Sequence, residues 1–440
     1  MSSIPGYPAK KSDWFWSVLG CVWSAGLMVH VAPFLHWSHA RIPAALIHWL
    51  VYLPLSAVAV LAFRALLQIA PEAPHESKNV GYISRLDHLR FLAAILVVMF
   101  HFYHGMIPME AYSGNPLLTL FSEGSSGVDL FFVLSGFIFG LIGQGKIIHY
   151  GNFIFSRLVR VYPLYLLGIV IVMAFNRGRF TPLDFGLLFL PVLNIDSLPN
   201  LPGFGQLWTI GLEFQFYLIF PFLMAFVARH GARYLVGLMG LGLALRGFYF
   251  SDLGTVRDIG QWSIIGRFDQ FAIGMLAASW YFRRGQRSTS PLHLGLAIMV
   301  VLAGLQWLAI WGGYQRGEKS PLWIIWDTVE GVMWAYLLVS YLTCRWALPQ
   351  WWDQTLSRLG QLSFSIYVFH SYAMYWALKH FASSDITGSR EWDAVLLGLF
   401  ICVPLAVVIA LPSYHLIEKQ FFVFRRKYIE SLPSSVSGEK

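Results

Sequence analysis

Long apolar runs are the feature that most limits what this chain can fold into. Several runs of about 18 or more apolar residues recur along it, and each is long enough to cross a hydrocarbon core as a helix. Of the 440 residues, 57% are hydrophobic and only 12% are charged, which is typical of an integral membrane protein. The sequence therefore predicts an all-α fold, a polytopic membrane bundle of helices.

The apolar runs divide into an N-terminal pair and ten core spans. The polar connector "PEAPHESKNVGYIS" separates an accessory two-helix membrane unit, residues 1–75, from a main domain at 82–422, and a short cytoplasmic tail follows at 423–440. One further segment, "PLDFGLLFLPVLNI" at 182–195, is short for a spanning helix and suits a re-entrant or interfacial position. The ten core spans are predicted near residues 89–110, 127–145, 158–176, 207–228, 233–250, 262–282, 292–312, 322–344, 362–381 and 393–416.

Membrane orientation explains the positive charge of the chain better than a nucleic-acid partner does. The formal net charge of +8 is spread over many short loops and forms no single basic patch. If residues 182–195 do not span, 21 of the 31 basic residues lie inside and 8 outside, which leaves Arg246 and Arg267 within spans. If they do span, the later loops place 12 basic residues outside against 5 inside. Since cytoplasmic loops carry the excess of Lys and Arg, the non-spanning segment is predicted, with both termini cytoplasmic.

The three cysteines, Cys21, Cys344 and Cys402, all lie in apolar surroundings. Their spacing matches neither a disulfide framework nor a metal site. They are predicted to be small buried side chains, and no metal is expected.

Ionisable side chains within the spans are the candidates for function, because such groups are costly in lipid and face a bundle interior or a wet cavity. In "RLDHLRFLAAILVVMFHFYHG", His101 follows Arg90 by 11 residues, which is about 16 Å along a helix and close to the same face. Arg90 at the cytoplasmic end and His101 near mid-membrane are therefore predicted to face one cleft. The alternative is a buried histidine beneath an interfacial arginine that extends to the headgroups.

A pair of arginines in "NFIFSRLVRVYPLYLL" is the second basic feature. Arg157 and Arg160 lie three residues apart on one helix face at the cytoplasmic boundary. Guanidinium groups bind phosphate through forked hydrogen bonds. With Arg90, the pair is predicted to clamp a polyanionic cofactor, while positive-inside anchoring of the helix is an equally weighted alternative.

Glu213, with Tyr217 one turn beyond it in "GQLWTIGLEFQFYLIFP", approaches from the opposite side. An unpaired carboxylate at that depth in the membrane is energetically costly. It either forms a structural pair, with Arg246 or Arg267, or serves as a catalytic acid or base.

The second-tier candidates are Tyr217 and three residues of two more segments, Asp129, Ser135 and His370. "GVDLFFVLSGFIFG" contributes Asp129 at its outer end and Ser135 at mid-depth, and Gly136 there allows close helix packing. In "LSFSIYVFHSY", three polar residues lie along one stripe of the predicted helix: Ser363, Tyr367 and His370. His370 is predicted to lie at a depth comparable with that of His101.

Taken in order, these stretches resemble the membrane acyltransferase family 3, the bacterial multi-pass O-acyltransferases that modify surface glycans. The resemblance covers residues 86–422 and rests on an Arg followed after ten residues by His, and on "GVDLFFVLSGF", "FSRLVRVYPLY", "LWTIGLEFQFYLIFP" and "LSFSIYVFH". Thr209 stands where family members often have serine. The N-terminal pair of spans lies outside the resemblance and receives no role from it.

The resemblance implies an acyltransferase of the bacterial inner membrane. Such an enzyme takes an acyl group, commonly acetyl, from acyl-CoA in the cytoplasm and delivers it to a hydroxyl of a glycan or glycolipid at the membrane or periplasmic face. By resemblance, Arg90, Arg157 and Arg160 bind the cofactor, His101 is the general base or the acyl carrier, and Glu213 is catalytic. Transfer is expected to be direct or to use a separate periplasmic partner.

A second class of function also suits the pattern. Twelve spans, midplane histidines and a buried glutamate are found in proton-coupled secondary transporters and would suit a lipid-linked glycan flippase. The two halves show no evident repeat, however, and paired arginines at one face fit a cofactor better. The acceptor, the acyl chain and the oligomeric state are open at this stage.

Overall fold

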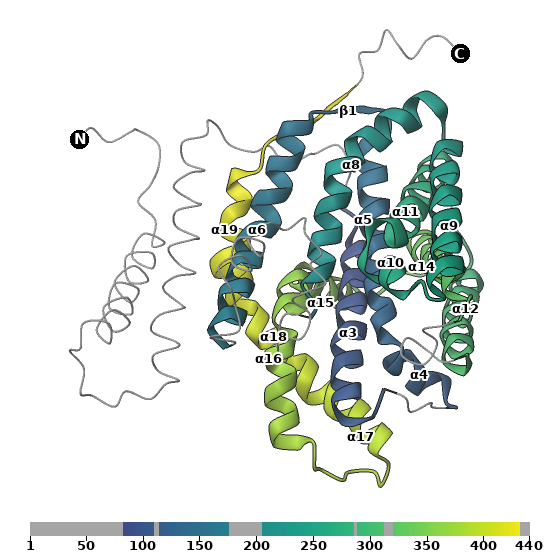
Figure 1. The fold of residues 1–440 in the computed structure, drawn as a ribbon. Helices are drawn as coiled ribbons and strands as arrows, with labels where there is room; N and C mark the ends of the chain where they lie inside the picture. Colours follow the sequence, from purple (N-terminus) through teal and green to yellow (C-terminus); the bar gives the residue numbers. More distant parts are fainter. Residues whose placement is uncertain (1–81, 110–113, 176–204, 286–287, 312–319, 432–440) are drawn as a thin grey trace, which may run out of the picture.

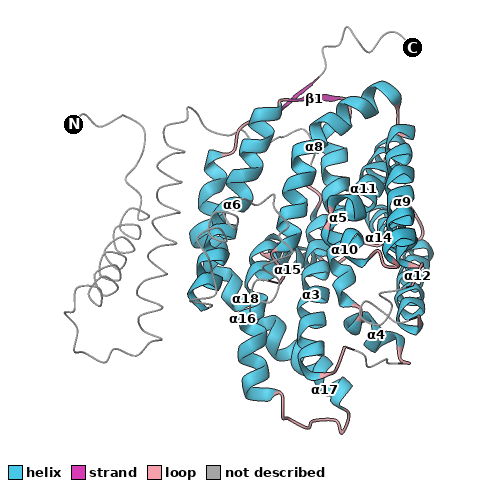
Figure 2. Cartoon of the chain, viewed as in Figure 1, coloured by secondary structure: helices cyan, strands magenta, loops and turns pink. Residues whose placement is uncertain are grey.

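The fold is a helical bundle with one small sheet at its end (Figures 1 and 2). The computed structural model describes residues 82–109, 114–175, 205–285, 288–311 and 320–431, so the predicted N-terminal pair, the segment 182–195 and Cys21 lie outside it. The helices are α3 (Ser84–Met106), α4 (Pro116–Ser122), α5 (Gly127–Gly143), α6 (Tyr150–Phe175), α8 (Trp208–His230), α9 (Arg233–Leu253), α10 (Arg257–Trp262), α11 (Ile264–Arg284), α12 (Pro291–Ile310), α14 (Trp323–Thr343), α15 (Gln350–Gln361), α16 (Ser363–Phe381), α17 (Arg390–Leu397), α18 (Val403–Ser413) and α19 (Lys419–Phe421).

Each of the ten predicted core spans coincides with a helix, and the last one is composite. There, α17, α18 and α19 are joined by π-helical turns at Gly398–Cys402 and Tyr414–Glu418. Seven segments of the described residues are long and apolar enough to cross a membrane, and the remaining three predicted spans are α11, α14 and α16. Large exposed apolar side chains cover the peripheral helices α9 and α12, among them Phe248, Leu292 and Met299. The chain is therefore a multi-pass membrane protein whose outer surface suits lipid.

Two glycines bring the backbones of α5 and α11 into direct contact. A Cβ added to Gly136 would lie 2.0 Å from the carbonyl oxygen of Phe271, and one added to Gly274 would lie 2.2 Å from that of Val133. Small residues allow such close approach between membrane helices. The predicted packing role of Gly136 is confirmed.

The start of α3 is held by a helix that the span pattern does not predict. α15 packs across this end, where a Cβ on Gly360 would lie 2.0 Å from the carbonyl oxygen of Asp87. Ser84 Oγ donates a hydrogen bond to Asp353 Oδ1 at 2.8 Å. These contacts fix the part of α3 that carries Arg90.

The chain beyond residue 422 also packs on the bundle. β1 (Lys146–Ile148) pairs antiparallel with β2 (Ile429–Ser431). Ser156 Oγ of α6 donates to the carbonyl oxygen of Arg426 at 3.0 Å. Part of the predicted tail at 423–440 therefore lies along α6, as Figure 1 shows for the yellow end of the chain.

Cys344 and Cys402 are buried free thiols. This confirms the prediction for these two cysteines.

Candidate active site

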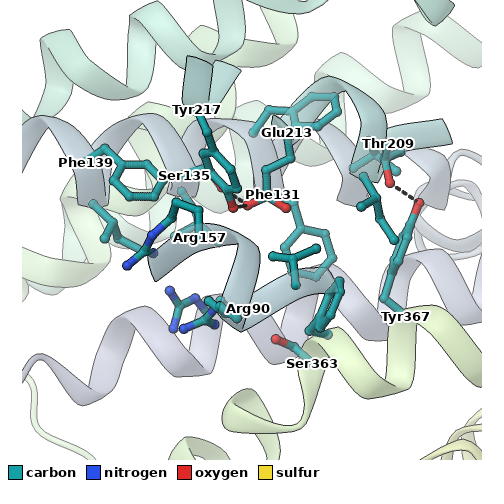
Figure 3. Close-up of a pocket in the computed structure, with 18 residues that line it drawn as sticks. Arg90, Phe131, Ser135, Phe139, Arg157, Thr209, Glu213, Tyr217, Ser363 and Tyr367 are labelled. Carbon is teal, nitrogen blue, oxygen red and sulfur yellow. Dashed lines mark hydrogen bonds between the residues drawn. The ribbon is translucent and has the colours of Figure 1, made fainter. Parts of the chain in front are cut away.

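One cavity brings together most of the predicted site residues (Figure 3). It lies among α3, α5, α6, α8 and α16. Its volume of about 100 Å³ is several times what one water molecule needs. Its polar lining comes from five helices and comprises Arg90, Ser135, Arg157, Arg160, Thr209, Glu213, Tyr217, Ser363 and Tyr367.

Three arginines form one side of the cavity, as predicted from their spacing. Arg90 Nη1 donates to Asp87 Oδ1 at 2.8 Å, one turn earlier on α3. Arg157 Nη2 donates to the Tyr428 hydroxyl at 3.2 Å, and its Nε is buried without a hydrogen-bond partner. The guanidinium of Arg160 is attracted electrostatically by the buried carboxylate of Glu418. Positive charge thus exceeds negative charge at this side of the cavity.

Arg425 is a fourth basic residue of this region that sequence reasoning missed. Its guanidinium carbon lies 3.6 Å from the centre of the Phe422 ring, and its Nε and Nη2 atoms are buried without hydrogen-bond partners. Burial, followed by the charges of Arg160 and Arg157, lowers its pKa from the ordinary value. An anion placed among these three guanidinium groups would therefore be stabilised. The sequence signal for Arg425 is the basic run after the last span, which also bears on membrane orientation.

Glu418 is the last residue of the π-helical turn Tyr414–Glu418. The turn directs the carboxylate into the protein, where it is 1% exposed and accepts a hydrogen bond from Ser365 Oγ at 3.0 Å. Single π turns in membrane helices are often found at functional sites. Glu418 is the second residue of this region that the sequence did not single out.

Glu213 faces the cavity from α8 and is held by two neighbours. The Tyr217 hydroxyl and Ser135 Oγ both donate to its Oε1, the latter at 3.3 Å. The alternative of a structural pair with Arg246 or Arg267 is wrong, because both of those arginines are bound to other carboxylates. Glu213 is instead a half-buried carboxylate directed at the cavity (Figure 3).

Asp129 belongs to a buried ion-pair network, and among the described residues it is not part of the cavity lining. It accepts hydrogen bonds from Arg267 and Gln270, while Arg267 also reaches Asp327 Oδ1 at 3.1 Å. Arg246 extends the network by its pair with Asp269. These contacts tie α5, α9, α11 and α14 together, which gives Asp129 a structural place.

Three carboxylates of this region lie close enough to resemble a metal site. Ligand atoms of Asp129, Asp327 and Glu330 all lie within 4.8 Å of one another. Arg267, however, already supplies a positive charge between the first two. The donor set is therefore that of a salt-bridge network.

The side of the cavity opposite the arginines ends at a hydrogen-bond chain. Thr209 Oγ1 donates to the Tyr367 hydroxyl at 2.8 Å (Figure 3). That hydroxyl donates to the carbonyl oxygen of Gln206 at 2.7 Å. Thr209 thus serves here as a hydroxyl donor, which a serine could also do.

His101 lies beyond this end and contacts His370. Its Nδ1 is 2.8 Å from the carbonyl oxygen of Val97 and 3.3 Å from His370 Nε2. His370 is fully buried and sits one turn after Tyr367 on α16. The prediction that Arg90 and His101 face one cleft is therefore wrong, because Arg90 lines the cavity whereas His101 does not and instead contacts His370 of α16 next to its end.

His104 has a structural place at the end of α3. Its Nε2 lies 2.8 Å from the carbonyl oxygen of Ser122, and its Nδ1 lies 3.4 Å from that of Ile107. It ties α3 to α4.

Comparison with known proteins identifies the family. A family model described as an acyltransferase domain matches residues 83–411. The exopolysaccharide production protein ExoZ of Rhizobium meliloti (strain 1021) is 27% identical over 264 residues, which cover 58% of this chain and 78% of ExoZ. Acyltransferase MdmB of Streptomyces mycarofaciens is 30% identical over 153 residues, 32% of this chain and 39% of MdmB. Peptidoglycan O-acetyltransferase OatA of Listeria monocytogenes serovar 1/2a is 27% identical over 186 residues, 37% of this chain and 28% of OatA.

No solved structure matches the chain significantly. The family match nevertheless covers the whole region that holds the cavity and the histidine pair. The chain therefore belongs to the membrane acyltransferase family 3, as its motifs predicted, and is an acyltransferase.

Proposed function

We propose that the protein is a membrane O-acyltransferase of the bacterial inner membrane, with both termini cytoplasmic. It moves an acyl group, most simply acetyl, from cytoplasmic acyl-CoA to a hydroxyl of a carbohydrate or glycolipid at the membrane or periplasmic face. ExoZ and OatA, whose names refer to exopolysaccharide production and peptidoglycan O-acetylation, support a glycan acceptor. Membership of an acyltransferase family favours this function over a proton-coupled transporter or a lipid-linked glycan flippase.

The observation that carries the proposal is a cavity with arginines on one side and a histidine pair next to the other. Coenzyme A carries its phosphates at one end and its thioester at the other, so it needs a long site of this kind. Arg90, Arg157 and Arg160 bind the phosphates by charge-assisted hydrogen bonds. The pantetheine arm then lies along Phe131 and Tyr367, which brings the thioester to the end of the cavity next to which His101 lies.

His101 carries the chemistry by one of two routes. As a general base, its Nε2 takes the proton of the acceptor hydroxyl while the oxygen attacks the thioester carbon, and CoA leaves as a thiolate that is then protonated. As a nucleophile, its Nε2 attacks the thioester carbon and CoA leaves as a thiolate. The acceptor oxygen then attacks the acyl-imidazolium and releases neutral His101, while the acceptor's proton goes to the CoA thiolate. Both routes need a free lone pair on Nε2.

Glu213 orients the acceptor. Its carboxylate faces the cavity, and Tyr217 and Ser135 hold it in place through Oε1. A carboxylate in this position accepts a hydrogen bond from a sugar hydroxyl and directs the oxygen toward the acyl carbon.

The test of the catalytic role is acyl transfer by the His101→Ala variant in native membranes, with labelled acetyl-CoA as donor and total membrane glycan as acceptor. Activity is expected to disappear while insertion and abundance stay normal. His293→Ala, which removes an exposed histidine at the start of α12, is the matched control. Transfer by His101→Ala at the rate of the control contradicts the catalytic role.

The phosphate clamp has a separate test. Arg157→Ala should raise the KM for acetyl-CoA, whereas Arg229→Ala, at the exposed end of α8, should not. A defect of Arg157→Ala that is confined to acceptor use contradicts the clamp.

A further inference from the structure

Two imidazole rings from different helices meet next to the cavity, and their hydrogen bonds define which nitrogens carry hydrogen. His101 comes from α3 and His370 from α16, with ring centres 4.9 Å apart. His370 is 0% exposed, whereas His101 is partly exposed. The described residues offer no hydrogen-bond partner to His101 Nε2.

Two backbone carbonyls assign the tautomers, because a carbonyl oxygen can only accept a hydrogen bond. His370 Nδ1 lies 2.7 Å from the carbonyl oxygen of Tyr367, so this nitrogen carries a hydrogen. His101 Nδ1 lies 2.8 Å from the carbonyl oxygen of Val97, so it carries one too. His370 Nε2 faces the same His101 Nδ1 at 3.3 Å, so the one hydrogen there is shared between the Val97 carbonyl oxygen and His370, and only a bare Nε2 can accept a share of it.

We infer that His370 is a positioning residue that, together with the Val97 carbonyl oxygen, holds His101 in the orientation and tautomer whose Nε2 lone pair is free to react. The inference rests on the proposed role of His101. One chain of hydrogen bonds runs from His101 Nδ1–H to His370 Nε2, and from His370 Nδ1–H to the carbonyl oxygen of Tyr367. Its far end is anchored in the same turn that closes the cavity.

The arrangement also serves the charged state of His101. When His101 Nε2 gains a proton or an acyl group, the ring becomes positive, and its Nδ1–H becomes a stronger donor. The lone pair of a neutral His370 then accepts a stronger hydrogen bond. A carboxylate in this place would do the same but would add a buried charge at membrane depth. A second neutral imidazole supplies the acceptor without that cost.

Side-chain replacements at position 370 separate this role from simple packing. The amide of glutamine reaches the position of the imidazole Nε2, and its oxygen can accept from His101. The amide of asparagine reaches only the position of Nδ1, where it can still donate to the Tyr367 carbonyl. Leucine fills the space without any polar atom.

The experiment measures transfer from labelled acetyl-CoA to membrane glycan by full-length His370→Gln, His370→Asn and His370→Leu in native membranes. Losing one hydrogen bond to a group that becomes charged corresponds to a fall in kcat of about 10- to 100-fold. We expect that fall for His370→Asn and His370→Leu, with an unchanged KM for acetyl-CoA. His370→Gln should recover most of the rate.

Equal rates for His370→Gln and His370→Leu overturn the inference, as does a rise in KM without a fall in kcat. The result is distinguishable from failure of the proposed function, since His101→Ala must be inactive in the same membranes for that function to stand. Nitrogen NMR of histidine-labelled protein adds a readout that does not depend on activity. His370 is expected to show a protonated Nδ1 and a bare Nε2, and a protonated Nε2 overturns the inference.

Discussion

Replacing Arg425 with alanine is the sharpest test of the basic side of the cavity. Two of its guanidinium nitrogens are buried without partners, although the side chain lies beside Arg157 and Arg160. If CoA phosphates satisfy these nitrogens, each hydrogen bond contributes about 1.5–3 kcal/mol. Loss of one such bond raises the Kd for acetyl-CoA by about 10- to 100-fold.

The same change has the opposite effect on the protein without donor. Burial and the charges of Arg160 and Arg157 lower the pKa of Arg425, which means that its positive form is disfavoured in the fold. The cost is present at pH values where the guanidinium is charged, and alanine removes it. The melting temperature of donor-free Arg425→Ala should therefore equal or exceed that of the wild type, while the stabilisation by added acetyl-CoA should shrink.

The assay is binding of acetyl-CoA to purified protein in lipid nanodiscs, together with thermal unfolding with and without acetyl-CoA. Arg426→Ala is the matched control, because it removes the same charge from the next residue, whose guanidinium lies over the Phe155 ring at 4.0 Å. An equal Kd for the two variants refutes the reasoning. A lower melting temperature of donor-free Arg425→Ala refutes the electrostatic part.

Three further substitutions have distinct expected outcomes. Glu213→Gln should lower kcat by about 100-fold with little change in the Kd for acetyl-CoA, because the carboxylate is proposed to orient the acceptor, and a raised Kd in nanodiscs contradicts this. Asp129→Ala should destabilise the protein by about 3–5 kcal/mol, since it removes a buried partner of Arg267, and denaturant unfolding that matches wild type counts against the network. Gly136→Ala should lower the melting temperature through a clash with the Phe271 carbonyl oxygen and cost about 1–3 kcal/mol, whereas an unchanged melting temperature would mean that α5 and α11 separate easily.

Much of the fold could be predicted because each membrane helix carries its own signal. A span needs a continuous apolar run, so length and hydropathy locate it without any knowledge of its neighbours. The spacing of Arg157 and Arg160 likewise fixed their shared helix face, and both line the cavity. Short helices such as α15 were not predicted, since they neither span nor follow the apolar pattern.

The partners of polar groups could not be predicted, because they come from helices far apart in the sequence. Glu213 could have paired with Arg246 or Arg267 on charge alone. The packing of α5, α9, α11 and α14 decided otherwise, since it pairs both arginines with Asp129, Asp269 and Asp327.

The sequence by itself determined the membrane class, the ten core helices, the family motifs and the three arginines that line the cavity, because local composition and helix period encode them. Only the tertiary structure decided that Arg425 returns to α6 beside Arg157. It also decided that His101 lies against His370 of α16, whereas Arg90 of the same helix α3 lines the cavity. Both outcomes depend on which helices lie side by side, and an apolar helix face carries little information about its neighbour.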